Sequence, residues 1–121
     1  MKKEREIIMV LTEVSKVSDE LVNKLKLTNG DKLYGCYVDD NIIGYAIIRN
    51  NLEERVYLEI LDKYQGYGYG SSAFKELLFL INGIVKCSVS LDNIKMQRII
   101  LKNNGIEAGR DGHLIHYVIE K

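Results

Sequence analysis

A glycine-rich segment, QGYGYGSS at residues 65–72, separates two apolar patterns of different period. Residues 56–61 before it have the composition of a strand, and residues 73–81 after it have the apolar spacing of a helix. Three glycines at every second position leave a tight turn without side chains, so its backbone N–H groups can approach a ligand closely. The helix adds its unpaired N-terminal donors and the positive end of its dipole. The segment therefore predicts a pocket for an anion such as a pyrophosphate.

The rest of the chain is expected to form one domain around this turn. With 121 residues, of which 46% are hydrophobic, the chain can bury roughly two thirds of the surface that its unfolded form exposes. The sequence contains no repeat, low-complexity segment or linker. We therefore predict a single domain over residues 1–121.

Charge and hydropathy exclude several classes of function. Seventeen basic residues balance seventeen acidic ones, so no overall field draws the protein to nucleic acid or to an anionic membrane. No apolar stretch approaches the roughly 18 residues needed to span a bilayer. The apolar run at residues 7–11 is too short for the core of a secretory signal. We expect a cytoplasmic protein with neither a nucleic-acid partner nor a membrane partner.

Neither the cysteines nor the histidines have the spacing of a metal or redox site. Cys36 and Cys87 each lie inside an expected strand and are predicted to be buried free thiols. His113 and His116 would point to opposite faces of a strand, because side chains alternate along it. No metal is therefore expected. Either histidine could still line a cleft for an acceptor, although a surface strand position is the simpler interpretation.

Turn residues divide the chain into alternating elements. Strands are expected at residues 6–13, 32–39, 42–50, 55–61, 84–90, 106–110 and 114–120. Helices are expected after Ser18 as N-cap, at residues 73–81 and at residues 93–103. The order is βαβββαβαββ, an α/β (α+β) arrangement in which short turns force the three middle strands to pair antiparallel. The final hairpin leaves a strand edge at which two copies could pair, so a homodimer is one expectation.

Two nucleotide-binding patterns can be compared with the glycine segment. A P-loop requires a lysine after its last glycine, whereas Ser71 follows Gly70, so this pattern is absent. A dinucleotide fingerprint requires GxGxxG after the first strand of a parallel sheet. Counted from Gly66, its third glycine position holds Ser71, and three antiparallel strands precede the segment. Asp92 lies at a suitable separation for a ribose contact, so a dinucleotide-binding domain stays open as an alternative.

The pattern QxxGxG, formed by Gln65, Gly68 and Gly70, resembles the coenzyme A signature of the GNAT superfamily of N-acetyltransferases. Residues 91–107 are similar to the family's later segment, in which an asparagine opens a helix that ends at a glycine. The resemblance covers about residue 32 to the C-terminus, and one short helix precedes it where the family commonly has two. It implies a mixed, mostly antiparallel twisted sheet with helices on both faces. It also implies direct transfer of an acetyl group from acetyl-CoA to a small-molecule or peptide amine.

The same resemblance implies which residues contact acetyl-CoA. Gln65 belongs to the signature, and backbone N–H groups of the segment that follows would hold the pyrophosphate, those of Gly66, Tyr67, Gly68, Tyr69, Gly70 and Ser71. An added-strand pairing with the pantetheine arm would involve Leu58, Glu59 and Ile60. Asn93 would contact the same arm, or it serves only as the cap of its helix.

Fewer residues match the catalytic positions of the family. A backbone N–H near Ile60 would polarise the thioester carbonyl. Glu54 is the candidate base by its position at the start of its strand, and Glu59 is the weaker candidate, on the opposite face. The position of the tyrosine that often supplies the acid holds Ile100, so the acid is absent or comes from elsewhere. A coenzyme A-binding module without catalysis stays open as a second hypothesis, and a protein-interaction domain as a third.

Overall fold

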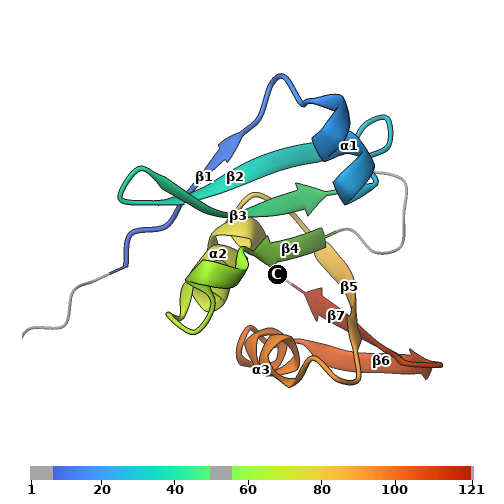
Figure 1. Cartoon of the computed structure of the whole chain (residues 1–121). Helices are drawn as coiled ribbons and strands as arrows, with labels where there is room; N and C mark the ends of the chain where they lie inside the picture. Colours follow the sequence, from blue (N-terminus) through green and yellow to red (C-terminus); the bar gives the residue numbers. More distant parts are fainter. Residues whose placement is uncertain (1–6, 50–55, 121) are drawn as a thin grey trace, which may run out of the picture.

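The computed structural model describes residues 7–49 and 56–120 (Figure 1). The strands are β1 (Val10–Glu13), β2 (Lys32–Val38), β3 (Asn41–Ile48), β4 (Val56–Ile60), β5 (Ile84–Ser90), β6 (Ile106–Asp111) and β7 (Leu114–Glu120). The helices are α1 (Asp19–Leu25), α2 (Tyr69–Phe79) and α3 (Ile94–Lys102), with a short 3-10 turn, η1 (Asp62–Tyr64), after β4. None of the helices described has the length and apolar character that crossing a membrane requires.

The predicted element order βαβββαβαββ is confirmed, and the sheet divides between β4 and β5 (Figure 1). One part has the strand order β1-β2-β3-β4 and the other β5-β7-β6, and every ladder within residues 7–49 and 56–120 is antiparallel. The edge strands β4 and β5 lie next to each other without forming a ladder. A dinucleotide-binding domain of parallel strands is therefore excluded as an alternative for the described part of the chain.

Helices cover both faces of the four-stranded sheet. Side chains alternate along β3, and apolar side chains point to each of its two faces. Ala46 and Ile48 belong to a large apolar cluster with the buried face of α2. Ile47 points to the other face and packs with Leu25 of α1. Figure 1 shows α1 and α2 on opposite sides of β2 and β3. The predicted placement of helices on both faces is therefore confirmed.

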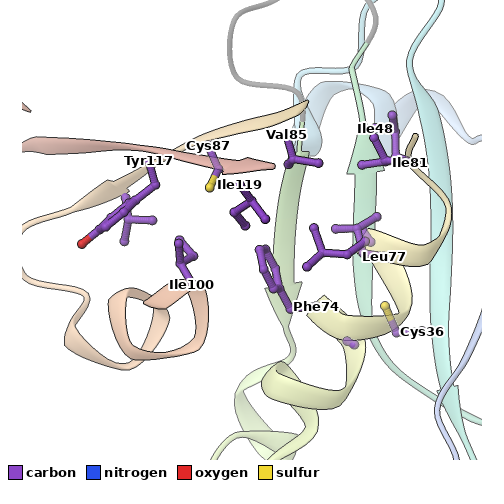
Figure 2. Packing of buried hydrophobic residues seen from close by; sticks show 14 of the residues in the cluster. Cys36, Ile48, Phe74, Leu77, Ile81, Val85, Cys87, Ile100, Tyr117 and Ile119 are labelled. Carbon is purple, nitrogen blue, oxygen red and sulfur yellow. The ribbon is translucent and has the colours of Figure 1, made fainter. Parts of the chain in front are cut away.

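The large apolar cluster joins the two sheets into one core (Figure 2). Phe74 and Leu77 of α2 and Ile100 of α3 are fully buried there, together with Val85 of β5 and Ile119 of β7. Burial of one such side chain stabilises the fold by roughly 1.5–3 kcal/mol. The same cluster includes Ala46 and Ile48 of the four-stranded sheet, so its packing holds the two sheets together.

Both cysteines are buried in this core and neither forms a disulfide, which confirms the prediction. Cys36 on β2 is fully buried, and burial raises the pKa of its thiol to about 12. Cys87 on β5 is buried beside α3 (Figure 2). Because the thiolate is the reactive form, the Cys36 side chain acts as a small apolar residue at neutral pH.

The bounds of α2 differ most from those predicted, 73–81. The helix begins at Tyr69, inside the glycine segment, and ends at Phe79, before the Asn82-Gly83 stop that the sequence indicated. Only the buried face of the helix, from Ala73 to Leu78, carries the apolar periodicity. Its first turn packs on the core through few side chains, so apolar spacing cannot reveal where it begins.

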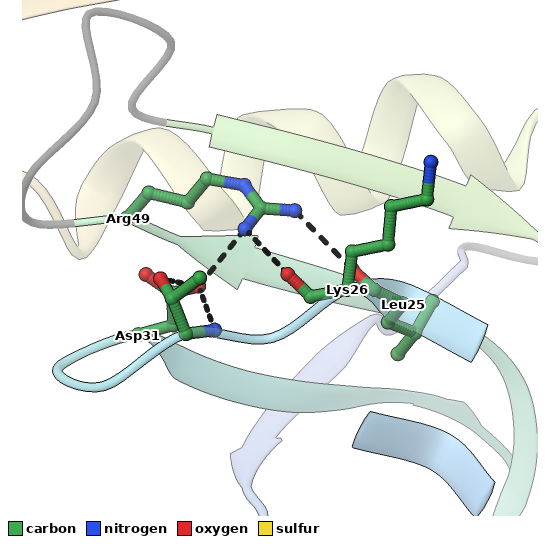
Figure 3. A network of polar contacts seen from close by, with 5 residues as sticks. Leu25, Lys26, Asp31 and Arg49 are labelled. Atoms are coloured by element: carbon green, nitrogen blue, oxygen red, sulfur yellow. Dashed lines mark hydrogen bonds and ion pairs between the residues drawn. The ribbon is translucent and has the colours of Figure 1, made fainter. Parts of the chain in front are cut away.

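A network of polar contacts holds the end of α1 to the strands (Figure 3). The guanidinium of Arg49, just after β3, donates to the carbonyl oxygens of Leu25 (3.3 Å) and Lys26 (3.4 Å). It also donates to the carboxylate of Asp31 at 2.9 Å. Asp31 accepts two further hydrogen bonds from Thr28, from its amide and its hydroxyl. Since the side chains of Arg49 and Asp31 are only 14% and 3% exposed, this ion pair is poorly screened by water.

Asp31→Asn should lower the free energy of unfolding by about 1.5 kcal/mol, because a neutral amide replaces a charged acceptor in this network. Urea unfolding followed by circular dichroism measures the loss. Asp40→Asn is the matched control, since Asp40 is exposed in the β2–β3 turn and asparagine tolerates its positive φ of 66°. We expect that variant to stay within about 0.5 kcal/mol of the natural protein. Similar losses in both variants would contradict a stabilising role of the network.

Candidate functional site

A cleft of about 660 Å³ opens between β4, the glycine segment and α3. β4 contributes Leu58, Glu59 and Ile60 to its wall. The segment from η1 into α2 contributes Tyr64, Gln65, Gly66, Gly68, Tyr69, Gly70 and Ser71. The third wall consists of Asn93, Lys95, Met96, Arg98, Ile99 and Lys102. Residues predicted as cofactor contacts from three separate stretches of sequence thus border one space.

The glycine segment turns directly into α2. Gly66 and Gly68 have φ angles of 87° and 81°, in the left-handed region that favours glycine. A Cβ atom on either residue would meet no other atom within 4 Å. Backbone conformation, and not crowding within the protein, therefore requires glycine at these two positions.

The N-terminus of α2 lies in the wall of the cleft. Gly68 is its N-cap, and the first turn starts with Tyr69, Gly70 and Ser71. The N–H groups of a first helical turn have no carbonyl group one turn earlier in the helix to bind. Together with the positive end of the helix dipole, they form a site suited to a phosphate group.

The side chain of Gln65 holds the glycine segment in place beside the cleft. Its side-chain Nε2 donates to the carbonyl oxygen of Ile60 at 3.0 Å and to the carboxylate of Asp62 at 3.4 Å. These bonds tie the glycine segment to the end of β4. The side chain of Gln65 thus orients the turn that precedes α2.

Tyr67 lies outside the lining of the cleft. Its side chain is 62% exposed, and its ring stacks on that of Tyr69 with 5.6 Å between the ring centres. The ring of Tyr64 also lies near that of Tyr69, with 6.4 Å between the ring centres. Of the three residues, Tyr64 and Tyr69 border the cleft. A contact of the Tyr67 N–H with a ligand stays a prediction.

Asn93 is the N-cap of α3, because its side chain accepts a hydrogen bond from the Met96 amide at 3.1 Å. The capping role that the sequence left open is therefore confirmed. Asn93 also borders both the cleft and a smaller cavity beside it. A contact with the pantetheine arm stays a prediction.

A smaller cavity of about 140 Å³ lies in the gap between β4 and β5. It is lined by Val56, Tyr57, Leu58, Phe74, Leu77, Cys87, Ser88, Val89, Ser90, Asn93, Met96 and Ile100. Leu58, Asn93 and Met96 border the large cleft as well. The two spaces therefore adjoin, and together they run from the N-terminus of α2 into the gap between the strands.

The predicted catalytic candidates fall in different places. Glu54 lies outside the described residues. Glu59 is half-buried and borders the cleft. Burial, with the Glu59 charge as a smaller cause, raises the pKa of the neighbouring Tyr57 phenol. Ile100, at the position of the family's tyrosine, is fully buried in the core.

Three cationic residues of α3 border the cleft and were not predicted as site residues. Lys95, Arg98 and Lys102, here called the cationic stripe, occupy one face of α3 because they are three and four positions apart. In the described part of the chain, no ion pair involves any of them. Their spacing within the helix predicted at residues 93–103 would have indicated this face.

The two histidines have different surroundings. His113 is exposed in the β6–β7 turn, where its carbonyl oxygen accepts a hydrogen bond from the Leu91 amide. His116 is half-buried on β7, and its Nδ1 lies 2.6 Å from the hydroxyl oxygen of Ser88 on β5. Ser88 in turn lines the smaller cavity.

No protein-family model matches the sequence, and no curated protein matches it in sequence. Solved structures match it in fold. The N-acetyltransferase PseH of Campylobacter jejuni in complex with acetyl coenzyme A has a TM-score of 0.73 at 13% identity, covering 94% of this chain and 99% of that chain. The spermidine/spermine N-acetyltransferase SpeG of Vibrio cholerae, in mutant form, has a TM-score of 0.71 at 15% identity, covering 93% and 95%.

A GNAT family acetyltransferase from Elizabethkingia anophelis with acetyl-CoA bound is similar over 98% of this chain and all of its own, with a TM-score of 0.65 at 12% identity. Each of these three structures is an acetyltransferase and is covered almost from end to end. The likeness therefore extends to both sheets and to the helices that border the cleft. The chain has the fold of the GNAT N-acetyltransferases.

Proposed function

We propose that this protein is an N-acetyltransferase, which transfers the acetyl group of acetyl-CoA directly to an amine. The observation that carries the proposal is the continuity of the cleft at the start of α2 with the gap between β4 and β5. Acetyl-CoA is a long ligand with phosphates at one end and a thioester at the other. A site for it must join an anion pocket to an extended channel, and these two spaces have that arrangement.

The charged groups that border the cleft are suited to the phosphate groups of acetyl-CoA. The N–H groups of Tyr69, Gly70 and Ser71 would hold the pyrophosphate. The cationic stripe of α3 borders the same space, where Glu59 is the acidic residue of the lining. Three cations and one carboxylate leave a positive balance, which favours a polyanionic ligand over a neutral one.

The gap between β4 and β5 is suited to the extended arm and the thioester of acetyl-CoA. One edge of β4 pairs with β3, and its other edge faces β5 without a ladder in residues 56–120. An extended chain that carries amides could pair with this free edge at Leu58 to Ile60, as an added strand does. The thioester would then lie in the smaller cavity, whose wall includes the apolar side chains of Val56, Phe74 and Ile100.

In such a complex the chain would do three things for the reaction. It would hold the thioester beside the amine, a positioning effect that can supply several kcal/mol. A backbone N–H of β4 near Ile60 would stabilise the developing negative charge on the carbonyl oxygen. Glu59, or Glu54 outside the described residues, is a candidate acceptor for the proton of the amine. The thiolate of coenzyme A can leave without a protein acid, because a thiol has a pKa of about 8.5.

An amine is the acceptor class that we propose, and SpeG, one of the similar structures, is a spermidine/spermine N-acetyltransferase. A module that binds coenzyme A without catalysis is the second candidate. Val56 and Leu58 on β4 carry no ionisable group, and Ile100 stands at the position of the family's tyrosine, which favours that candidate.

The expected result is that acetyl-CoA stabilises the protein by about 2.7 kcal/mol at a hundredfold excess over its Kd, measured by thermal unfolding. NAD serves as the control and should have no effect. Stabilisation by NAD and not by acetyl-CoA would contradict the proposal. Release of free thiol from acetyl-CoA, with spermidine, small amines and a peptide as acceptors, separates the enzyme from the binding module. Native mass spectrometry of the same sample shows bound coenzyme A and tests the homodimer.

A further inference from the structure

Ser88 and His116 face each other across the ladder between β5 and β7. They are register partners in that ladder, and the Ser88 Oγ lies 2.6 Å from the His116 Nδ1. This separation is at the short end of the range for hydrogen bonds between side chains. Both residues are half-buried, so water competes weakly for the bond. A hydroxyl group joined in this way to an imidazole can give up its proton to the ring.

The alternation of side chains along β5 determines to which face of the sheet Ser88 points. Cys87 and Val89, on either side of Ser88, are buried in the core with Ile100 of α3. The Ser88 side chain therefore points to the face of the sheet away from α3. It still borders the cavity in the gap, because the gap runs along the free edge of β5. The Ser88 hydroxyl is thus accessible from the face of the sheet opposite the core.

β4 has the same alternation on the other side of the gap. Leu58 and Ile60 pack on the core cluster, so Tyr57 and Glu59 point away from it. Tyr57 also borders the smaller cavity. The polar groups of the two strand edges thus lie on the face opposite α2 and α3. An amine that approached from this face would meet a thioester held in the gap.

We propose that Ser88 and His116 form the proton relay of acetyl transfer, which rests on the function proposed above. When the amine nitrogen bonds to the thioester carbon, it carries a proton that it must lose. Ser88 Oγ accepts this proton while its own hydroxyl proton passes to His116 Nδ1. The C–S bond then breaks, and its electron pair leaves on sulfur. The thiolate takes a proton from water, and the imidazolium returns its proton to the hydroxide that remains, so the products are an amide and a free thiol.

The other polar side chains of the smaller cavity are less suited to take up the proton. The Ser90 hydroxyl accepts a hydrogen bond from the Asp92 amide, and the Asn93 side chain caps α3. Burial raises the pKa of the Tyr57 phenol, so this group stays protonated at neutral pH and is a donor rather than a base. Of the polar groups on this cavity wall, Ser88 is the one joined to an imidazole in the described part of the chain.

His116→Asn is the decisive variant, because its amide can keep a hydrogen bond to Ser88 but cannot take up a proton. With spermidine or the best acceptor of the panel, we expect kcat to fall about a hundredfold while the Kd for acetyl-CoA is unchanged. His113→Asn, in the β6–β7 turn, is the matched control and should keep the natural rate. Ser88→Ala should lose as much as His116→Asn, and the double variant no more than either, since the pair acts as one unit.

Rescue by imidazole in solution distinguishes proton transfer by His116 from a purely structural role. His116→Ala leaves a space beside Ser88, and added imidazole should restore part of the lost rate. A natural rate in His116→Asn, or no rescue of His116→Ala, would overturn the relay. A natural protein that binds acetyl-CoA but releases no thiol with any acceptor would overturn it too, and would leave a coenzyme A-binding module. Failure to bind acetyl-CoA at all would instead overturn the proposed function.

Discussion

Gly44→Ala should lower the free energy of unfolding by about 3 kcal/mol, through a single added methyl group. Gly44 lies opposite Ile60 in the β3–β4 ladder. A Cβ atom there would overlap the Glu59 carbonyl oxygen and lie 3.1 Å from the Ile60 Cα. Because backbone atoms cannot rotate away, the two strands must separate. Their separation weakens ladder hydrogen bonds, worth about 1 kcal/mol each, and disturbs the close packing behind them.

Urea unfolding followed by circular dichroism measures this loss. Gly35→Ala on the neighbouring strand β2 is the matched control, since its Cβ would meet the ring of Tyr37, with 2.9 Å to Cε2. That ring is half-buried and can move aside, so we expect a loss of about 1 kcal/mol. Equal losses in the two variants would show that contact with backbone is not the cause. Gly44→Ala should also weaken acetyl-CoA binding, because β4 carries one wall of the cleft.

Gly68→Val should weaken acetyl-CoA binding at least a hundredfold, or about 2.7 kcal/mol. Gly68 is the N-cap of α2 and borders the cleft. The space around its missing Cβ is empty to 4 Å, and in our proposal this space belongs to the pyrophosphate. A valine would place three carbon atoms there. It would also strain the backbone, whose φ of 81° is unfavourable for a β-branched residue.

The control must separate lost space from backbone strain. Gly83, after the end of α2, has a φ of 86° and likewise no atom within 4 Å of its missing Cβ, but it lies away from the cleft lining. Both valine variants should lose about 1–2 kcal/mol of stability through strain. Isothermal titration calorimetry should show that only Gly68→Val loses acetyl-CoA. Equal loss in Gly83→Val would mean that strain alone, and not the filled pocket, weakens binding.

The position of the glycine segment could be predicted because its determinants are local. The positive φ angles of Gly66 and Gly68 depend on the absence of a side chain at those positions. The cap formed by Asn93 could be predicted for the same reason, since its partner Met96 is three residues away. The cationic stripe was also accessible, because the spacing of Lys95, Arg98 and Lys102 is visible once the helix is assigned. The exact start of α2 was not, since its first turn carries no apolar period.

The Ser88–His116 pair could not be derived from the sequence, although both residues were visible in it. They are 28 positions apart, and a shift of one residue in the β5–β7 register would turn their side chains to different faces. The contact between Asp31 and Arg49 likewise depends on how β2 and β3 meet the end of α1. Neither pair has a local pattern that distinguishes it from ordinary surface residues.

The sequence by itself determined the order of the elements and the turn between β4 and α2, because periodicity, capping residues and glycine conformation act over a few neighbouring positions. The tertiary structure alone decided that the sheet divides between β4 and β5, and that the cavity in this gap adjoins the cleft. The cavity is bordered by Phe74 and Ile100, which pack with Ile119 in one core although the three come from different elements. Their contacts arise only when distant segments share one core, and no short stretch of sequence records them.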